Sequence, residues 1–199
     1  VFVLEDTTAL KQQKTFSDDI IFRARDSTGI EAPTLDPLVI SAGIGPAIVR
    51  RVLIDCGASC NILFKKTFDQ MKIPMIDVQA SSQKIAGFTG EPKQPIGTID
   101  LLVELREGER KVVRKQTFVI VDEFSAYNAF LGCPTLAAFK AILAPWCLTI
   151  KFPTDNGVGV IKGDQNAARE CYLTELRESR KREMGKDAAT PVRIKEPAL

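Results

Sequence analysis

Asp55 is the residue of this sequence that is best placed to do chemistry. It follows the apolar residues 52–54 and is followed at once by Cys56 and Gly57, in the stretch RVLIDCGASCNILF. Burying an unpaired carboxylate is costly, so a carboxylate at the end of an apolar strand needs either a partner or a chemical use. The simpler interpretation is a turn aspartate whose side chain accepts a hydrogen bond from a nearby backbone amide.

A second Asp-x-Gly triplet gives an internal comparison. Asp155, Asn156 and Gly157 follow a Pro-Thr pair, and this composition predicts a hairpin turn of the Asn-Gly kind. The Asp55 triplet differs because apolar segments lie on both sides of it. Asp-x-Gly alone is a weak signal, and the choice between a turn and a functional site needs further residues.

The chain contains no histidine, which narrows the possible chemistry. Ser-His-Asp and Cys-His nucleophilic machineries are excluded, and carboxylates remain as the acid–base groups. Five cysteines without a Cys-x-x-Cys pair predict free thiols in a reducing compartment. A metal or redox site around Cys56, Cys60 and Cys133 is a less favoured alternative, since no histidine accompanies them. We therefore expect neither a metal nor another cofactor.

The overall composition is that of an ordinary globular protein, with 45% hydrophobic and 26% charged residues. A net charge of +2 gives no reason to expect nucleic-acid binding by this domain. No apolar run is long enough to cross a bilayer and no signal-peptide pattern is present, so we expect a cytoplasmic location and no membrane contact. Residues from Arg169 onward carry many charges of both signs, which favours a solvated helix and a tail.

The elements that must position Asp55 are predicted to be mostly strands. Short apolar segments alternate with turn residues from Asp18 onward, which indicates an all-β class. The clearest pair is a hairpin joined at residues 107–109. Other expected strands are 20–24, 38–44, 47–55, 147–154 and 157–163.

Three helical segments complete this prediction. Residues 61–71 favour a short helix or turn, and Pro134 is placed to begin a helix that continues to Lys140. Asp164 is a candidate N-cap for an exposed helix. We divide the chain into a leader at 1–17, a domain at 18–162, and a helical linker with a charged tail at 163–199.

Four motifs in order resemble one known family. They are RRVLIDCGASCNILF, AGFTG, YNAFLGCPTL and KFPTDNGVGVIKGDQNAARECY. Together they resemble the retropepsin-like aspartic peptidases, and more closely the protease segment of plant gypsy-type LTR retrotransposon Gag-Pol polyproteins. The resemblance extends over roughly Asp18 to Tyr172, and the order of four short motifs makes it specific.

This resemblance implies a fold, an activity and a set of site residues. The fold would be a retropepsin-like closed barrel, one half of the acid-protease fold, with a short helix near the C-terminal end of its core and an exposed C-terminal helix. Asp55 would be catalytic, and the activity would be that of an aspartic endopeptidase that cuts its own polyprotein, in the cytoplasm or within virus-like particles. The remaining positions would be the active-site loop Cys56, Gly57 and Ala58, the flap Ala86, Gly87, Phe88, Thr89 and Gly90, and the structural support Leu131 and Gly132.

Such peptidases use two aspartates that share one proton and one water molecule. This chain offers one well-placed Asp-x-Gly and no duplicate half, so the second carboxylate would come from another copy across a two-fold axis. The expected partners are therefore a second copy of the chain and a peptide or polyprotein substrate.

The chain departs from the family pattern at three positions. Cys56 stands where retroviral enzymes have a Thr or Ser that braces the dimer, and a thiol is a weaker donor. Ser59 and Cys133 replace an acidic and a basic residue that form an ion pair in those enzymes. Two alternatives follow: a folded but inactive module for dimerisation or peptide binding, and a monomeric barrel with another use.

Overall fold

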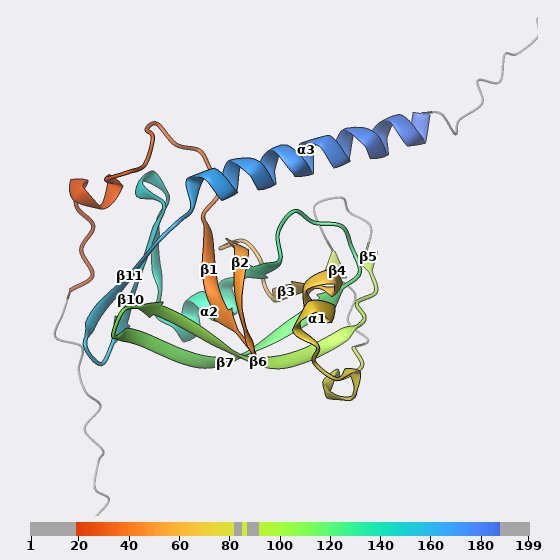
Figure 1. Ribbon diagram of the computed structural model, residues 1–199, viewed down its shortest axis with the longest axis horizontal. Coiled ribbons are helices and arrows are strands. Elements are labelled where there is room, and N and C mark those ends of the chain that lie inside the picture. Colours follow the sequence, from red (N-terminus) through yellow and green to blue (C-terminus); the bar gives the residue numbers. More distant parts are fainter. Residues whose placement is uncertain (1–18, 82–84, 87–91, 188–199) are drawn as a thin grey trace, which may run out of the picture.

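A closed β-barrel of six strands, in the order β1-β2-β8-β3-β7-β6, forms the centre of the molecule (Figure 1). The computed structural model describes residues 19–81, 85–86 and 92–187. The all-β class with a closed barrel is thereby confirmed. The barrel strands are β1 (Val39–Ile44), β2 (Ala47–Ile54), β3 (Asn61–Phe64), β6 (Gly97–Glu107), β7 (Arg110–Val121) and β8 (Ala129–Leu131).

Two smaller sheets and several helices surround the barrel. Strands β9 (Ile142–Ala144), β10 (Thr149–Thr154) and β11 (Gly157–Lys162) form one sheet, and β4 (Ile85–Ala86) pairs with β5 (Pro92–Lys93). The helices are α1 (Lys65–Met71), α2 (Cys133–Ala138) and α3 (Gln165–Asp187), with 3-10 turns η1 (Ala24–Ser27), η2 (Met75–Asp77) and η3 (Pro145–Cys147). Within the described ranges, no helix combines the length and apolar character needed to span a membrane.

Local turn chemistry sets both long hairpins. Strands β6 and β7 are joined at Gly108, whose φ of +56° lies in the left-handed region that glycine tolerates. The second Asp-x-Gly triplet connects β10 to β11, with Thr154 opposite Gly157 and a φ of +95° at that glycine. The prediction of a hairpin turn at Asp155 is confirmed.

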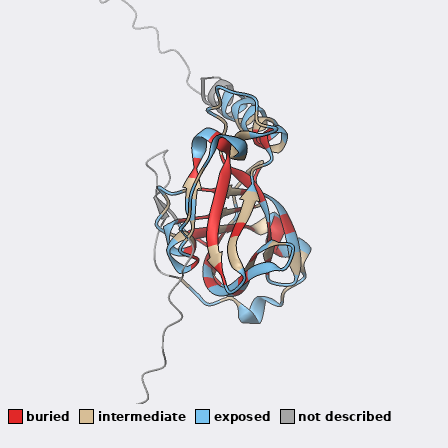
Figure 2. Cartoon of the chain, turned by 90° about the vertical axis from the view of Figure 1, so that its left-hand side faces the viewer, coloured by how far each residue is buried: buried red, intermediate tan, exposed pale blue. Residues whose placement is uncertain are grey.

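Alternation along β2 separates an interior from an outer face. Val52 and Ile54 are buried in the barrel core, whereas Leu53 belongs to a second apolar cluster on the outside. Figure 2 shows the buried strands running through the centre of the molecule. The buried members of this second group, here called the outer cluster, are Val39, Phe64, Tyr127, Ala168 and Cys171.

The outer cluster includes the first turns of α3. Asp164 caps this helix as predicted, accepting a hydrogen bond from the Ala167 N–H at 2.9 Å. The domain boundary at residue 163 stays a prediction. The structure adds that Ala168 and Cys171 are almost fully buried against the barrel, while Tyr172 and Leu173 remain about half exposed.

Two of the predicted elements differ in kind from the structure, and others differ at their ends: the predicted strand 147–154 begins at Thr149 as β10, and the predicted helix from Pro134 to Lys140 is α2, Cys133–Ala138. Residues 20–24 were expected to be a strand, and they lead instead into η1. The 3-10 turn is favoured because the Asp26 carboxylate accepts a hydrogen bond from the Arg23 N–H at 2.7 Å. The predicted helix or turn at 61–71 begins only at Lys65, because Asn61–Phe64 pairs as β3 with both β7 and β8.

Lys151 on β10 holds the segment that leads into η1 against the three-stranded sheet. Its Nζ donates hydrogen bonds to the Ile21 carbonyl at 2.6 Å and to Asp26 Oδ2 at 2.8 Å, and it lies 4.7 Å from the centroid of the Phe22 ring. The hydrogen bond from Lys151, with a smaller contribution from the Arg23 N–H, lowers the pKa of Asp26. Asp26 therefore favours its charged form in the folded protein.

We expect this ion pair to make stability depend on acid pH. Because the native pKa of Asp26 is lowered, its contribution is complete above the unfolded-state pKa of about 3.9 and is lost as pH falls through the native pKa. Asp26→Asn should flatten this part of the dependence of unfolding free energy on pH, measured by urea denaturation between about pH 3 and 7. Asp155→Asn, in an exposed turn, is the control. Equal slopes for wild type and Asp26→Asn would contradict the prediction.

Candidate active site

Asp55 lies where β2 leaves the barrel. Strand β2 runs parallel to β8, with Leu53 opposite Phe130 and Ile54 opposite Leu131, and the Asp55 N–H continues this ladder by donating to the Leu131 carbonyl at 3.0 Å. Since successive side chains alternate, Asp55 shares the outer face with Leu53. The backbone pairing with β8 therefore fixes the position of Asp55.

The Asp55 side chain is held but still accessible. Its Oδ1 accepts a hydrogen bond from the Gly57 N–H at 2.9 Å, and its carbonyl accepts one from the Ala58 N–H at 3.2 Å. The turn hydrogen bond of the simpler interpretation is thus present. Asp55 itself is half-buried, and both Cys56 and Gly57 are exposed. Among the described residues, only the Gly57 N–H forms a hydrogen bond to the carboxylate.

Other atoms come close to two glycines around this loop, and at Gly132 they leave no room for a side chain. The φ of Gly57 lies outside the left-handed region, and a Cβ there would come within 3.3 Å of Asp55 Oδ1. At Gly132 a Cβ would lie 2.5 Å from the Cys60 carbonyl oxygen and 2.6 Å from that of Ala58. Gly57 leaves room for the carboxylate, and Gly132 lets β8 pass directly beneath the loop.

A buried amide braces the loop from below. Asn61 Oδ1 accepts hydrogen bonds from the Gly132 N–H at 2.9 Å and from Thr135 Oγ1 at 2.8 Å, and Asn61 Nδ2 donates to the Thr117 carbonyl at 3.0 Å. Asn61 is only 1% exposed, so the loss of these bonds would leave a buried polar group unsatisfied. Sequence reasoning missed this residue. The only indication of Asn61 in the sequence is that a polar amide stands directly before the apolar run ILF.

Cys133 makes a second connection between α2 and the loop. Its N–H donates to the Ala58 carbonyl at 2.9 Å, and its Sγ–H donates to the Cys56 carbonyl at 2.8 Å. Where the family pattern has an ion pair, the Cys133 side chain and backbone N–H here hold the two segments together. The loop that carries Asp55 is therefore fixed by β8, Asn61 and Cys133.

Comparisons with known proteins give similarity only at the level of solved structures. No family model and no curated protein matches the chain. The retroviral protease-like domain of Ddi1 from Leishmania major aligns with a TM-score of 0.47 and 16% identity, over 64% of this chain and 93% of that one. EIAV protease in complex with the inhibitor HBY-793 gives 0.42 and 18%, over 58% and 99%. A retropepsin-like aspartic protease from Rickettsia conorii gives 0.40 and 16%, over 62% and 80%.

The structure places the other predicted site residues in two groups. Ala58, Leu131 and Gly132 lie together with Asp55, and Leu131 is fully buried beneath the loop. Ala86 belongs to β4 and pairs with Pro92 of β5. The predicted flap residues Gly87, Phe88, Thr89 and Gly90 lie outside the described residues.

The cysteines near Asp55 are not arranged as a metal centre in the described part of the chain. No group of three or more His, Cys, Asp or Glu side chains there could hold a metal ion. Burial raises the pKa of the Cys60 thiol, which favours its protonated form. The acid–base group that the site offers is therefore the Asp55 carboxylate.

Proposed function

We propose that this chain is a homodimeric aspartic endopeptidase in which two copies of Asp55 form the catalytic pair. The observation that carries this proposal is the Asp55 carboxylate itself, which is accessible on a firmly braced loop and has no second carboxylate as a recorded partner among the described residues. One carboxylate per chain is half of the machinery for water-mediated peptide hydrolysis. A two-fold axis beside this loop would complete it.

In such a dimer, two carboxylates at about 3 Å cannot both be charged, so they share one proton. The charged carboxylate removes a proton from a water molecule, which attacks the carbonyl carbon of the peptide bond. The protonated carboxyl donates its proton to the carbonyl oxygen, which gives a tetrahedral intermediate with two hydroxyl groups. The C–N bond then breaks as the carboxyl that took the water proton passes it to the departing amine and the other carboxylate takes a hydroxyl proton, so the pair again holds one proton. In each chain the Gly57 N–H orients Asp55 through its hydrogen bond to Oδ1.

The proposed substrate is an extended peptide with apolar side chains near the cleaved bond. Leu53 and Phe130 are half-buried on the outer face that Asp55 shares, and they offer apolar surface next to the carboxylate. An extended peptide would bind there through backbone hydrogen bonds of the β type. The motifs that resemble plant gypsy-type polyproteins support the chain's own polyprotein as this substrate.

A second candidate is a dimerisation or peptide-binding module without activity. It is favoured by Cys56, which is exposed and whose thiol has no recorded hydrogen bond within the described residues. A weaker brace at this position would leave the two loops of a dimer less well aligned. A folded dimer that binds peptide and cleaves none between acidic and neutral pH would favour this candidate.

The dimer requirement predicts that cleavage per chain rises with protein concentration. Because one chain holds one Asp55, activity should follow the dimer fraction and reach a plateau above the dissociation constant of the dimer. Peptide cleavage that is sensitive to pepstatin, measured beside sedimentation velocity at the same concentrations, tests this. If the chain sediments as a monomer and its rate of cleavage per chain does not change with concentration, the shared site is contradicted.

A further inference from the structure

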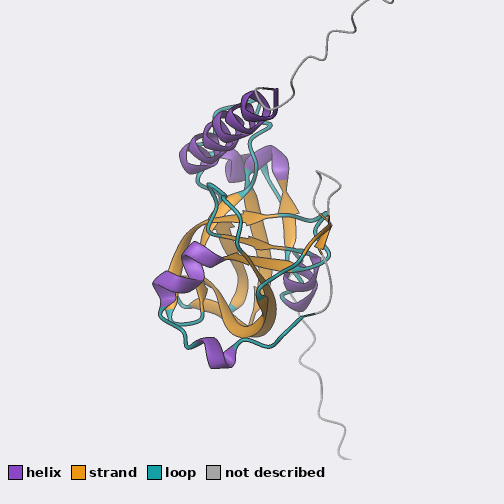
Figure 3. Cartoon of the chain, turned by 90° about the vertical axis from the view of Figure 1, so that its right-hand side faces the viewer, coloured by secondary structure: helices purple, strands orange, loops and turns teal. Residues whose placement is uncertain are grey.

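Helix α3 packs on the same face of the barrel that carries Asp55. Figures 1 and 3 show α3 lying along one side of the barrel, beyond the ends of β1 and β2. Ala168 and Cys171 are buried there with Val39 and Tyr127 in the outer cluster. Leu53, two residues before Asp55, packs against this cluster as well.

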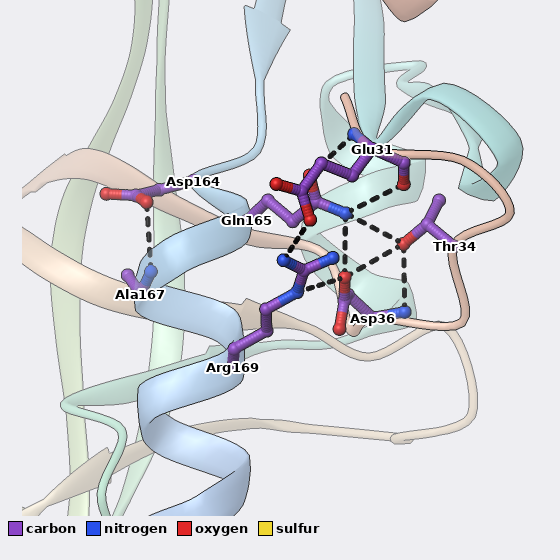
Figure 4. Close-up of polar contacts among 7 residues, drawn as sticks. All are labelled: Glu31, Thr34, Asp36, Asp164, Gln165, Ala167 and Arg169. Atoms are coloured by element: carbon purple, nitrogen blue, oxygen red, sulfur yellow. Dashed lines mark hydrogen bonds and ion pairs between the residues drawn. The ribbon is translucent and has the colours of Figure 1, made fainter. Parts of the chain in front are cut away.

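The first attachment of α3 is a polar network at its N-terminal end (Figure 4). Gln165 Nε2 donates to Asp36 Oδ2 at 2.8 Å and to the Glu31 carbonyl at 3.1 Å. Arg169 forms ion pairs with Asp36, at 3.1 Å, and with Glu31. This network fixes the beginning of the helix to the segment that precedes β1.

The second attachment lies near the middle of the helix, on the loop that leads into β8. Glu175 Oε1 accepts hydrogen bonds from Ser125 Oγ at 2.8 Å and from the Ala126 N–H at 2.7 Å. Cys171 Sγ–H donates to the Ala126 carbonyl at 3.5 Å. Burial, with the nearby Cys171 and Glu175 adding to it, raises the pKa of Tyr127 to about 12. The helix is thus docked close to the loop from which β8 runs toward Asp55.

The outer cluster extends from α3 to Leu53 and Phe130, which remain only partly buried. Phe130 lies opposite Leu53, and both are half-buried in the same cluster as the α3 residues. A peptide that reaches Asp55 with apolar side chains on both sides of the cleaved bond must extend along this face. Its outer residues would then meet α3.

We propose that α3 is a reversible strap, which while docked covers part of the surface used by a peptide bound at Asp55. This inference rests on the proposed peptidase function. The buried apolar residues that α3 itself contributes are the small Ala168 and Cys171, so the helix adds little apolar surface of its own to the docked state. Release of α3 opens the full outer face to an extended substrate.

The test compares two variants of the full chain that introduce the same side chain. Ala168→Glu places a carboxylate at a fully buried position and should displace α3, because an unpaired buried charge is not tolerated. Leu173→Glu adds the same charge at a half-exposed position of the same helix and is the control. Glu175→Ala, which removes the acceptor for Ser125 and Ala126, is a milder second variant. Hydrogen exchange of α3 and of the barrel strands shows whether the helix alone is released.

If α3 competes with the substrate, Ala168→Glu should raise kcat/KM for a long apolar peptide by about 5- to 150-fold, the usual range of coupling between sites. Glu175→Ala should give a smaller increase, and Leu173→Glu none. The coupling is reciprocal. Pepstatin bound to the wild-type chain should therefore accelerate modification of the buried Cys171 by iodoacetamide. The rate of modification is measured by mass spectrometry of the peptide that contains Cys171.

The outcomes separate this inference from the proposed function. Equal or lower kcat/KM in Ala168→Glu, with unchanged or slower Cys171 modification when pepstatin is bound, would overturn the strap and leave the peptidase intact. Absence of cleavage and of pepstatin binding in both wild type and Ala168→Glu would overturn the peptidase proposal, and the strap with it. Faster cleavage together with faster Cys171 modification supports both.

Discussion

Asp55→Asn is expected to abolish peptide cleavage while the chain stays folded. The substitution keeps the shape of the side chain and an oxygen that can accept the Gly57 N–H, so the loop should be retained. It removes the acid–base function from both halves of the dimer, and general acid–base catalysis contributes about 10²- to 10⁴-fold in rate. Cleavage of a peptide substrate should therefore fall by at least that factor, with an unchanged thermal unfolding midpoint.

Two controls make this result specific. Asp155→Asn changes the other Asp-x-Gly triplet, which is an exposed hairpin turn, and should leave cleavage at the wild-type rate. An excess of Asp55→Asn chains added to wild-type chains should suppress activity, because mixed dimers hold one catalytic carboxylate. Undiminished cleavage by Asp55→Asn would remove Asp55 from the mechanism, and an undiminished rate in the mixture would exclude the shared dyad.

The parts of the fold that the sequence predicts well are those set by local chemistry. The hairpin at Gly108 and the turn after Asp155 depend on residues next to each other, whose backbone preferences are already visible in the sequence. The position of Asp55 at the end of a core strand is likewise local, since the apolar run before it forms β2.

The parts that the sequence does not predict depend on residues far apart in the chain. Asn61 braces Gly132 across the loop, and nothing near Asn61 in the sequence indicates that contact. Residues 20–24 begin with an apolar run that is typical of a strand, but the partner that holds them is Lys151 of β10. The sequence did not predict the packing of α3 against the barrel. Its buried apolar positions are small residues such as Ala168, which give little hydrophobic periodicity in a highly charged helix.

The partial exposure of Asp55 has a similar explanation. The apolar residues before it predict a buried environment, and in the single chain the carboxylate instead lies on the outer face, next to the exposed Cys56. The apolar pattern predicts the strand, but it does not predict which end of the strand is accessible to solvent. An accessible carboxylate on a braced loop is the state from which a second copy could pair with it.

Gly132→Ala is expected to have the second largest effect, because it acts on the support under that loop. Gly132 has φ −91° and ψ −171°, an extended conformation that alanine adopts without cost, so the effect should be purely steric. Its Cβ would lie 2.5 Å from the Cys60 carbonyl oxygen, which must move. Overpacking of this kind costs about 1–3 kcal/mol in unfolding free energy.

The same displacement should reach Asp55, because Ala58 is also in contact with Gly132 and is hydrogen-bonded to the Asp55 carbonyl. A shift of about 1 Å at a reacting group can lower the rate by about 10²-fold, so kcat/KM should fall far more than stability alone would explain. Gly108→Ala is the matched control: it strains a hairpin with positive φ and open space around it, and should reduce stability without changing kcat/KM. Wild-type cleavage by a folded Gly132→Ala chain would show that the position of the loop does not depend on the close approach of β8.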